Sequence, residues 1–331
     1  MPKWEKTEKV QKRLCMELIS VVMSVYNEKP MWLRKSIESI LNQTYSNIEY
    51  IIILDNSDNV ELENIIKEYS QKDNRIRFLK NVSNQGLVYS LNKGIREAKG
   101  QYIARMDADD YSIKERLEQQ YSCLIKNDVD FVMSNVDFLY DEKFVPGSQI
   151  SDLNSNQFVY MLQFGDVSIH PTWFFKREVY DNVGGYREIS YCEDLDFLLR
   201  AVQRGYKCFK MKERLLFYRL RQNGITKSNG LEQFTKARIL RQAYRREESI
   251  DTITPLYLKK CCEKIKNGDK IEFSKANGEI DQFVKALNER KLMKAFANFC
   301  CGILKSKYYR ILFFQAVNYR LKLVLCVKGI V

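Results

Sequence analysis

Residues 101–110 read QYIARMDADD, an apolar run that passes directly into a cluster of three aspartates. The first six residues are typical of a buried strand, and Asp107, Asp109 and Asp110 follow at its end. Carboxylates this close raise one another's pKa unless a metal ion or a basic group neutralises them. Carboxylate oxygens are also the ligands that hard divalent cations prefer. The stretch therefore predicts a strand that ends in a divalent-cation site facing an anionic group.

Three similar apolar runs precede this one, and helical patterns separate all four. Runs rich in Val and Ile that are apolar on both faces, with helices between them, are typical of a parallel sheet covered on both sides. We therefore expect an α/β fold with a Rossmann-like, open and mostly parallel sheet. The predicted strands are 18–25, 48–54, 75–80 and 101–106, and the predicted helices are 31–42, 60–71, 86–98 and 113–127.

Each of these strands is followed by residues suited to binding a nucleotide. In open α/β sheets, ligands bind outside the carboxyl ends of the strands, where Tyr26, Asp55, Asn84 and the cluster at 107–110 fall in this prediction. Taken singly, Asp55 is also explained as a turn cap, and Asn84 with Gly86 as the start of a helix. Their shared location is the stronger signal, and it predicts one ligand site at this edge of the sheet.

The chain beyond residue 128 has a less regular pattern. A further strand is expected at 129–138, and 148–165 forms a connection without a clear periodicity. An amphipathic helix is expected at 195–204, where Gly205 ends it. A turn-rich stretch at 223–230 then precedes a basic and helical C-terminal region. We predict an N-terminal extension at 1–17, an α/β domain at 18–230 and the C-terminal region at 231–331.

Composition limits the function classes. The chain has 331 residues, 45% of them hydrophobic, and a formal charge of +12, which favours an anionic partner. No nucleic-acid-binding motif is present, so we expect no nucleic acid partner. Nine cysteines without a CxxC spacing favour a reduced, cytoplasmic protein, and the charged start of the chain favours no export. No uncharged apolar stretch of about 18 residues occurs, so we expect no transmembrane span.

Several short motifs recur in an order that resembles bacterial glycosyltransferase family 2, of the surface-polysaccharide type. The resemblance covers 18–228. The motifs are ISVVMSVYNE at 19–28, Asp55, NQGL at 84–87, DADD at 107–110, HPT at 170–172, GGY at 184–186 and ED at 193–194.

This resemblance implies a GT-A fold and an inverting transfer of a sugar from a nucleoside diphosphate donor. Direct displacement needs a general base for the acceptor hydroxyl and a group that stabilises the departing diphosphate, a role that Mn²⁺ or Mg²⁺ fills. The resemblance makes Asp109 the principal metal ligand, with Asp107 contacting the donor sugar or ribose and Asp110 supporting the site. The alternative for these acids is a solvated helix N-terminus before Ile113, where acidic residues are also favoured.

The donor is expected to be a UDP-sugar. By the same resemblance, Tyr26 stacks on the base, Asp55 accepts the imide proton of uracil, and Asn27 with Glu28 shapes the ribose end. Leu54 stands where many relatives carry another acid. The remaining predicted donor-binding residues are Ser24, Asn84, Gly86, Arg105 and Ala108.

The expected catalytic base is Asp194, beside Glu193 at the start of a helix, where the helix dipole favours a carboxylate. Alternatively, Asp194 caps that helix. His170, the one histidine of the chain, and Trp173 are expected on the acceptor side. The alternatives are a histidine satisfied by the backbone in the core and a buried aromatic residue.

Arg221 stands where many relatives carry a histidine that completes the metal shell. A guanidinium does not ligate a cation, but it can bind a diphosphate through two parallel hydrogen bonds. We therefore expect Arg221 to bind phosphate, while carboxylate, diphosphate and water hold the metal.

The C-terminal region carries apolar residues at helical spacing at 292, 296, 299, 303 and 304, then the runs 311–317 and 321–327, with Lys and Arg interspersed. It could lie on an anionic membrane, at the inner face of the cell membrane, or it could pack on its own core. The resemblance suggests a glycan or lipid-linked acceptor for capsule, O-antigen or exopolysaccharide synthesis and leaves the sugar open. The alternative function is a non-catalytic, membrane-associated binding or scaffold protein with the same fold.

Overall fold

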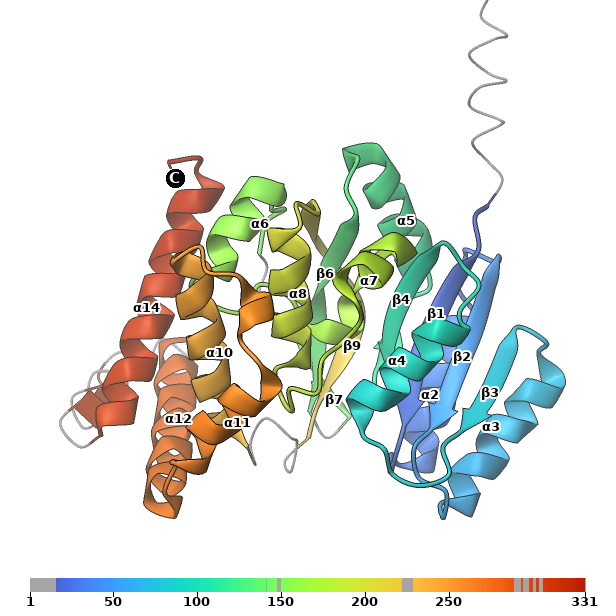
Figure 1. Ribbon diagram of the computed structural model, residues 1–331, viewed down its shortest axis with the longest axis horizontal. Coiled ribbons are helices and arrows are strands. Elements are labelled where there is room, and N and C mark those ends of the chain that lie inside the picture. The colour runs from blue at the N-terminus through green and yellow to red at the C-terminus, as the bar shows by residue number, and fades with distance from the viewer. Residues whose placement is uncertain are drawn as a thin grey trace, which may run out of the picture. The chain divides into compact units, whose positions relative to one another are not determined.

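A computed structural model describes residues 16–330, except 141, 148–149, 222–228, 289–292, 294–297, 300–301 and 304–305. The described chain forms two compact units (Figure 1). The first unit runs to Asp152 and adds Ser168–Gly185 and Tyr206–Arg219, and the second comprises Leu153–Val167, Tyr186–Gly205 and the chain from Leu220 onward. The predicted boundary at residue 230 stays a prediction, since compactness does not show which segment folds alone.

The first unit is built on a nine-stranded sheet in the order β3-β2-β1-β4-β8-β6-β9-β5, with β7 paired to β6. Four parallel strands form one half of it: β1 (Ile19–Val25), β2 (Ile48–Leu54), β3 (Ile76–Lys80) and β4 (Tyr102–Asp107). Antiparallel pairing joins β8 (Phe174–Lys176) to β4 and to β6 (Phe131–Tyr140), β7 (Lys143–Val145) to β6, and β5 (Tyr111–Ser112) to β9 (Cys208–Leu220). The α/β, GT-A-like fold with a Rossmann-like sheet is confirmed.

The parallel strands form because their apolar runs are buried on both faces. Every residue of β2 is buried, and β1 is buried except at Ser24. The register places Ser24 beside Ile53 and beside Asp107, so the carboxyl ends of β1, β2 and β4 lie next to one another. This alignment gathers the residues that follow the strands at one edge of the sheet.

Helices cover the parallel half of the sheet. They are α2 (Pro30–Leu41), α3 (Val60–Lys72) and α4 (Leu87–Glu97), each within two residues of its predicted bounds. Gly94 lets α4 approach closely, because a Cβ atom there would lie 2.6 Å from Val22 Cγ1 and 2.7 Å from Ile53 Cδ1. The predicted helix 113–127 starts later, as α5 (Arg116–Asn127), since 111–112 form β5. A short α7 (Arg177–Val183) follows β8.

The second unit is helical. Its elements are α6 (Ser155–Leu162), α8 (Glu193–Gln203), α10 (Gly230–Arg245), α11 (Pro255–Glu263), α12 (Asn267–Asn288) and α14 (Lys307–Val327). α14 lies along α12 and α6 (Figure 1). The helical C-terminal prediction is confirmed for the described residues, while Leu292, Phe296 and Leu304 lie outside them. None of the helices in the described parts of the chain is both long and apolar enough to cross a membrane.

One helix of this unit was not expected from the sequence. α6 lies in the connection 148–165 and begins with a capping box, in which Asn154 accepts from the backbone N–H of Gln157 and the Gln157 side chain accepts from that of Asn154. The reciprocal bonds satisfy amide groups at the start of a helix of eight residues.

Candidate functional site

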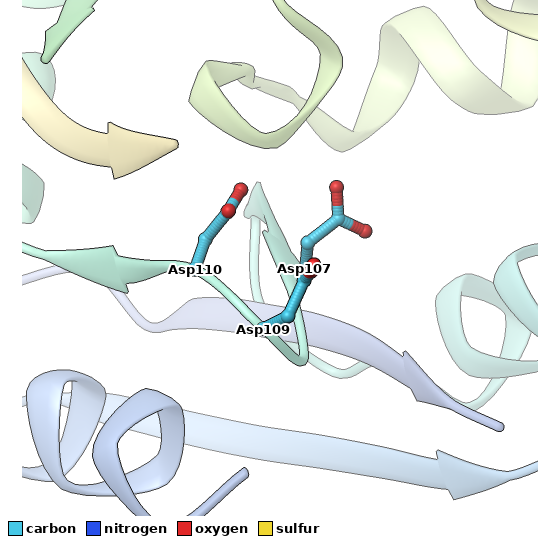
Figure 2. Close-up of side chains that lie close together, drawn as sticks. All are labelled: Asp107, Asp109 and Asp110. Atoms are coloured by element: carbon cyan, nitrogen blue, oxygen red, sulfur yellow. The ribbon is translucent and has the colours of Figure 1, made fainter. Parts of the chain in front are cut away.

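Three carboxylates gather where β4 ends. One ligand oxygen each of Asp107, Asp109 and Asp110 lies within 4.8 Å of the others, and all three side chains point to the same side of the loop (Figure 2). Ala108 between them is buried in the core of the sheet and anchors the loop. The acids precede the strand β5, and α5 begins only at Arg116, so they do not form its first turn. The alternative of a solvated helix N-terminus therefore does not describe them.

Asp110 is the most buried acid of the cluster, at 1% exposure. Its Oδ1 accepts a hydrogen bond of 2.7 Å from the backbone N–H of Arg219, and its Oδ2 is buried without a hydrogen-bond partner among the described residues. Burial, followed by the charges of Asp109 and Asp107, raises the pKa of Asp110 well above its ordinary value. A buried carboxylate oxygen without a donor, beside two further carboxylates, fits a divalent cation with oxygen ligands.

Arg219 holds this loop from β9. Its Nε donates to the backbone oxygen of Asp109 at 2.8 Å, its guanidinium lies 4.5 Å from the ring centre of Trp32, and it forms an ion pair with Glu142. The side chain is 2% exposed, and its Nη2 is buried without a partner among the described residues. Arg219 is therefore a buried positioning residue of the acidic loop, and sequence analysis missed it.

Glu142 links Arg219 to the helix α2. It accepts from Trp32 Nε1 at 2.9 Å and from Lys35 Nζ at 3.1 Å. Burial alone would raise the pKa of Glu142, but the hydrogen bond from Lys35 and the charge of Arg219 lower it below its ordinary value. The carboxylate stays ionised, and it balances Arg219 so that this arginine need not pair with the aspartates.

Arg105 lies on β4 and forms an ion pair with Asp107, while its backbone N–H donates to the oxygen of Trp173 at 2.9 Å. Burial, followed by the charge of Arg105, lowers the pKa of His170 well below its ordinary value. The imidazole is therefore neutral at neutral pH. His170 is buried and lies against the Trp173 ring, with ring centres 4.5 Å apart.

Trp173 is a core residue rather than an exposed platform. It is 1% exposed, its Nε1 donates to Ser168 at 3.1 Å, and its ring packs edge-on to Phe131. The prediction that Trp173 faces an acceptor sugar is corrected here, because burial leaves no ring face for a sugar. The alternative interpretation, a buried aromatic, describes its position.

The predicted donor-binding residues lie at the adjacent strand ends. Tyr26 is 48% exposed and follows β1, and its backbone N–H donates to Glu28 at 2.8 Å. Asn27 accepts from Asn59 at 3.3 Å, which connects the ends of β1 and β2. An exposed ring beside a shared strand edge offers a surface on which a planar base can stack.

Asp55 is buried and organises the loop before α4. Its carboxylate accepts from Asn81 at 2.7 Å and from the backbone N–H groups of Gln85 and Gly86, each at 2.8 Å. Gly86 has φ of +87°, a conformation that favours glycine, and Asn84 Oδ1 also accepts from its N–H at 3.1 Å. A carboxylate offers about four acceptor positions, so three bonds leave one for a ligand.

Comparisons with known proteins give the family of this chain. The family model described as "Glycosyl transferase family 2" matches residues 20–184. An uncharacterized glycosyltransferase of Methanocaldococcus jannaschii is 38% identical over 213 residues, 61% of this chain and 71% of the relative. The chain belongs to glycosyltransferase family 2.

Two further relatives of this family carry more informative names. The O-antigen biosynthesis glycosyltransferase WbnJ of Escherichia coli is 34% identical over 218 residues, 64% of this chain and 84% of the relative. The putative glycosyltransferase EpsE of Bacillus subtilis is 33% identical over 232 residues, 69% of this chain and 82% of the relative. The match to these two glycosyltransferases thus covers about two thirds of this chain and more than four fifths of each relative.

Asp194 and Glu193 of this glycosyltransferase lie in the first turn of α8, in the second unit. The N-cap residue is Cys192, so Asp194 is not the cap, although its Oδ1 accepts from the N–H of Leu195 at 2.7 Å. Asp196 of the same turn is fully buried and forms ion pairs with Arg187 and Arg200. Asp196 is therefore structural, and the role of Asp194 as catalytic base stays a prediction.

Arg221 follows the end of β9 and belongs to the second unit, so its predicted contact with phosphate also stays a prediction. Arg219, two residues earlier, donates from its Nε to the backbone oxygen of Asp109 in the acidic loop. In the sequence, the Arg-Leu-Arg alternation at 219–221 was a signal for a strand with both arginines on one face, and it could have indicated Arg219.

Proposed function

We propose that this glycosyltransferase moves a hexose from a UDP-sugar to a hydroxyl group of a glycan or lipid-linked oligosaccharide, with inversion and with Mn²⁺ or Mg²⁺. The observation that carries the proposal is the cluster of Asp107, Asp109 and Asp110, with the buried Oδ2 of Asp110 lacking a donor among the described residues. The named relative in O-antigen biosynthesis supports a surface polysaccharide as the product.

On the donor side, Asp109 would be the main ligand of the cation, with Asp110 beside it and Asp107 directed to the donor by its ion pair with Arg105. A bound divalent cation would supply Lewis-acid stabilisation of the departing diphosphate. Arg219 keeps the backbone of Asp109 in place, and Arg221 would contact the diphosphate. These roles follow from the residues' chemistry and from the family motifs.

At the base and ribose end, Tyr26 would stack on uracil and the remaining acceptor position of Asp55 would receive the imide proton. Asn27, Glu28 and Ser24 at the end of β1 would shape the ribose side, and Asn84, Gly86 and the backbone of Ala108 would line the same edge. The bonds from the 85–86 loop hold Asp55 in a fixed orientation, which favours one base over another.

On the acceptor side, Asp194 would take the proton of the attacking hydroxyl as the new glycosidic bond forms, with Glu193 beside it. The first turn of α8 favours the ionised carboxylate, because the N–H groups of a helix N-terminus are directed toward it. A neutral and buried His170 would support the site through Arg105 rather than exchange protons.

The test is a screen of UDP-sugars with Mn²⁺ or Mg²⁺, in which UDP release is measured with and without glycan acceptors. We expect turnover by the intact chain, competition by UDP but not by GDP, and a β-linked product from an α-linked donor. Asp109→Ala should lose turnover, while Asp181→Ala, an exposed acid of α7 in the same unit, should retain it. Binding of UDP-sugars without turnover across donors and acceptors would instead support a scaffold protein.

A further inference from the structure

Helix α14 is apolar on two sides, and among the described residues its neighbours cover one of them. On the inner side, Tyr309 and Cys326 are buried, Tyr319 Oη donates to the oxygen of Asp166 at 3.2 Å, and Gln157 Nε2 donates to the oxygen of Cys326 at 2.9 Å. These bonds fix α14 along α6 within the second unit (Figure 1). The helix therefore has a defined orientation, and its other side is a defined surface.

That other side carries a row of exposed apolar residues. Phe314 and Leu321 are each 60% exposed, and Val324 is 53% exposed. Spacings of three and four residues put such positions on one face of a helix. The outer face of α14 comprises Phe314, Val317, Leu321, Val324 and Val327.

The charges around the outer face have one sign. The segment 307–331 contains Lys307, Arg310, Arg320, Lys322 and Lys328 and no Asp or Glu. Arg310, Arg320 and Lys328 are exposed. A second copy of this chain would set cations against cations on that face, with no acid of the same segment to compensate them. The complementary partner is an extended anionic surface that also accepts apolar side chains.

We propose that the outer face of α14 binds the surface of a bilayer that contains anionic phospholipids. Its apolar residues enter the interface between headgroups and acyl chains, and Arg310, Arg320 and Lys328 contact the headgroup phosphates. The helix lies in the plane of the membrane, in agreement with the finding that no described helix is suited to span it. This binding goes beyond the proposed reaction and does not depend on it, since it requires neither donor nor acceptor.

The experiment is flotation of the full chain with phosphatidylcholine vesicles that contain or lack phosphatidylglycerol, without nucleotide or metal. Leu321→Gln is compared with Leu256→Gln, because both leucines are 60% exposed on helices of the second unit. We expect Leu321→Gln to weaken binding by about tenfold, as one inserted leucine is lost, and Leu256→Gln to bind as the parent chain does. Val324→Gln should repeat the loss.

The electrostatic part has its own pair of variants. Arg320→Gln should weaken binding to the anionic vesicles by about fivefold, and Lys259→Gln, an exposed lysine of α11, should not. Binding of the parent chain should fall as salt is added. Equal flotation of Leu321→Gln and Leu256→Gln would overturn the proposal. It would also be overturned if the parent chain bound neither kind of vesicle and formed a dimer, detected by light scattering, that Leu321→Gln dissociates.

Discussion

Two buried aspartates in the two units are compensated in opposite ways. Asp196 in α8 is fully buried and pairs with Arg187 and with Arg200, whose Nη2 lies 2.9 Å from its Oδ2. Asp110 is 1% exposed, receives one backbone N–H, and leaves its Oδ2 without a donor among the described residues. Two arginine side chains thus neutralise Asp196, whereas Asp110 accepts a hydrogen bond from a backbone N–H.

The difference identifies which acid is available to a ligand. A buried carboxylate between two guanidinium groups has its charge and acceptor positions occupied, so it stabilises the fold and excludes a metal ion. Asp110 lies beside two further carboxylates, of which Asp107 pairs with Arg105, while Arg219 pairs with Glu142. The cluster of three acids therefore still suits an added cation. Asp55 lies between these two cases, because three neutral N–H donors bind its carboxylate but no arginine neutralises it among the contacts described above.

The largest effect on turnover is expected when the cluster of Asp107, Asp109 and Asp110 is disrupted. Asp109→Ala removes a carboxylate from the group that would hold the cation, and we expect turnover to fall by about a thousandfold or more. UDP release under saturating donor, measured over a range of Mn²⁺ concentrations, checks this. Asp181→Ala is the matched control, and full turnover of Asp109→Ala would remove the cluster from the reaction.

Substitution of Asp196, the acid paired with two arginines, should lower the stability of the fold. Asp196→Asn leaves the guanidinium groups of Arg187 and Arg200 without their charge partner, and we expect the free energy of unfolding to fall by about 3 kcal/mol. Urea denaturation monitored by circular dichroism measures it. Asp181→Asn disrupts an exposed pair with Arg177 and should cost less than about 1 kcal/mol.

Asp110→Asn is the corresponding variant in the first unit, and urea denaturation measures its stability as well. Asn has the shape of a protonated carboxyl group, so we expect a change smaller than about 1 kcal/mol without metal. The stabilisation that added Mn²⁺ gives to the parent chain should disappear in this variant. If Asp110→Asn destabilised the protein as much as Asp196→Asn, the distinction between the two acids would be wrong.

The parallel half of the sheet was predictable because burial on both faces leaves a local signature. The strands at 19–25, 48–54 and 102–107 lie within one residue of their predictions. β5, β8 and β9 were not predicted, since two or three residues carry too little pattern and β9 mixes charged with apolar positions. The sequence therefore indicated the acidic cluster but not what holds it.

The missed contacts depend on pairing between distant segments. Tyr111 pairs with Phe217 across β5 and β9, and this antiparallel register carries Arg219 to the backbone of Asp109. Such a pairing spans about a hundred residues of chain and is set by tertiary packing rather than by local propensity. For the same reason, the sequence left two interpretations of Trp173 open, a platform for a sugar and the more common buried aromatic.

A variant of Arg219 tests how the loop that carries Asp109 is held in position. Arg219→Lys keeps the charge near Glu142 but removes the Nε–H bond to Asp109 and the planar contact with Trp32. We expect kcat to fall by about tenfold, with weaker binding of Mn²⁺ and a nearly unchanged KM for the donor. Arg214→Lys, on the same strand and paired with Asp137, is the control. An unchanged affinity for Mn²⁺ in Arg219→Lys would show that the acidic loop holds its position without this arginine.

The smallest effect is expected at Asp55, whose carboxylate accepts hydrogen bonds from the backbone N–H groups of Gln85 and Gly86. Gly86→Ala meets no neighbouring atom within 4 Å, so its cost comes from φ of +87° alone, about 1 kcal/mol in the free energy of unfolding. Relief of that strain would move the N–H of residue 86 away from Asp55, and we expect UDP affinity to fall by about fivefold in calorimetric titrations. Gly268→Ala in α12 also meets open space but has no positive φ, so it should be neutral or slightly stabilising. Equal stability and equal UDP affinity of Gly86→Ala and Gly268→Ala would mean that the 85–86 loop does not orient Asp55. Asp55 would then stabilise the fold, as Asp196 does, and would not bind the donor.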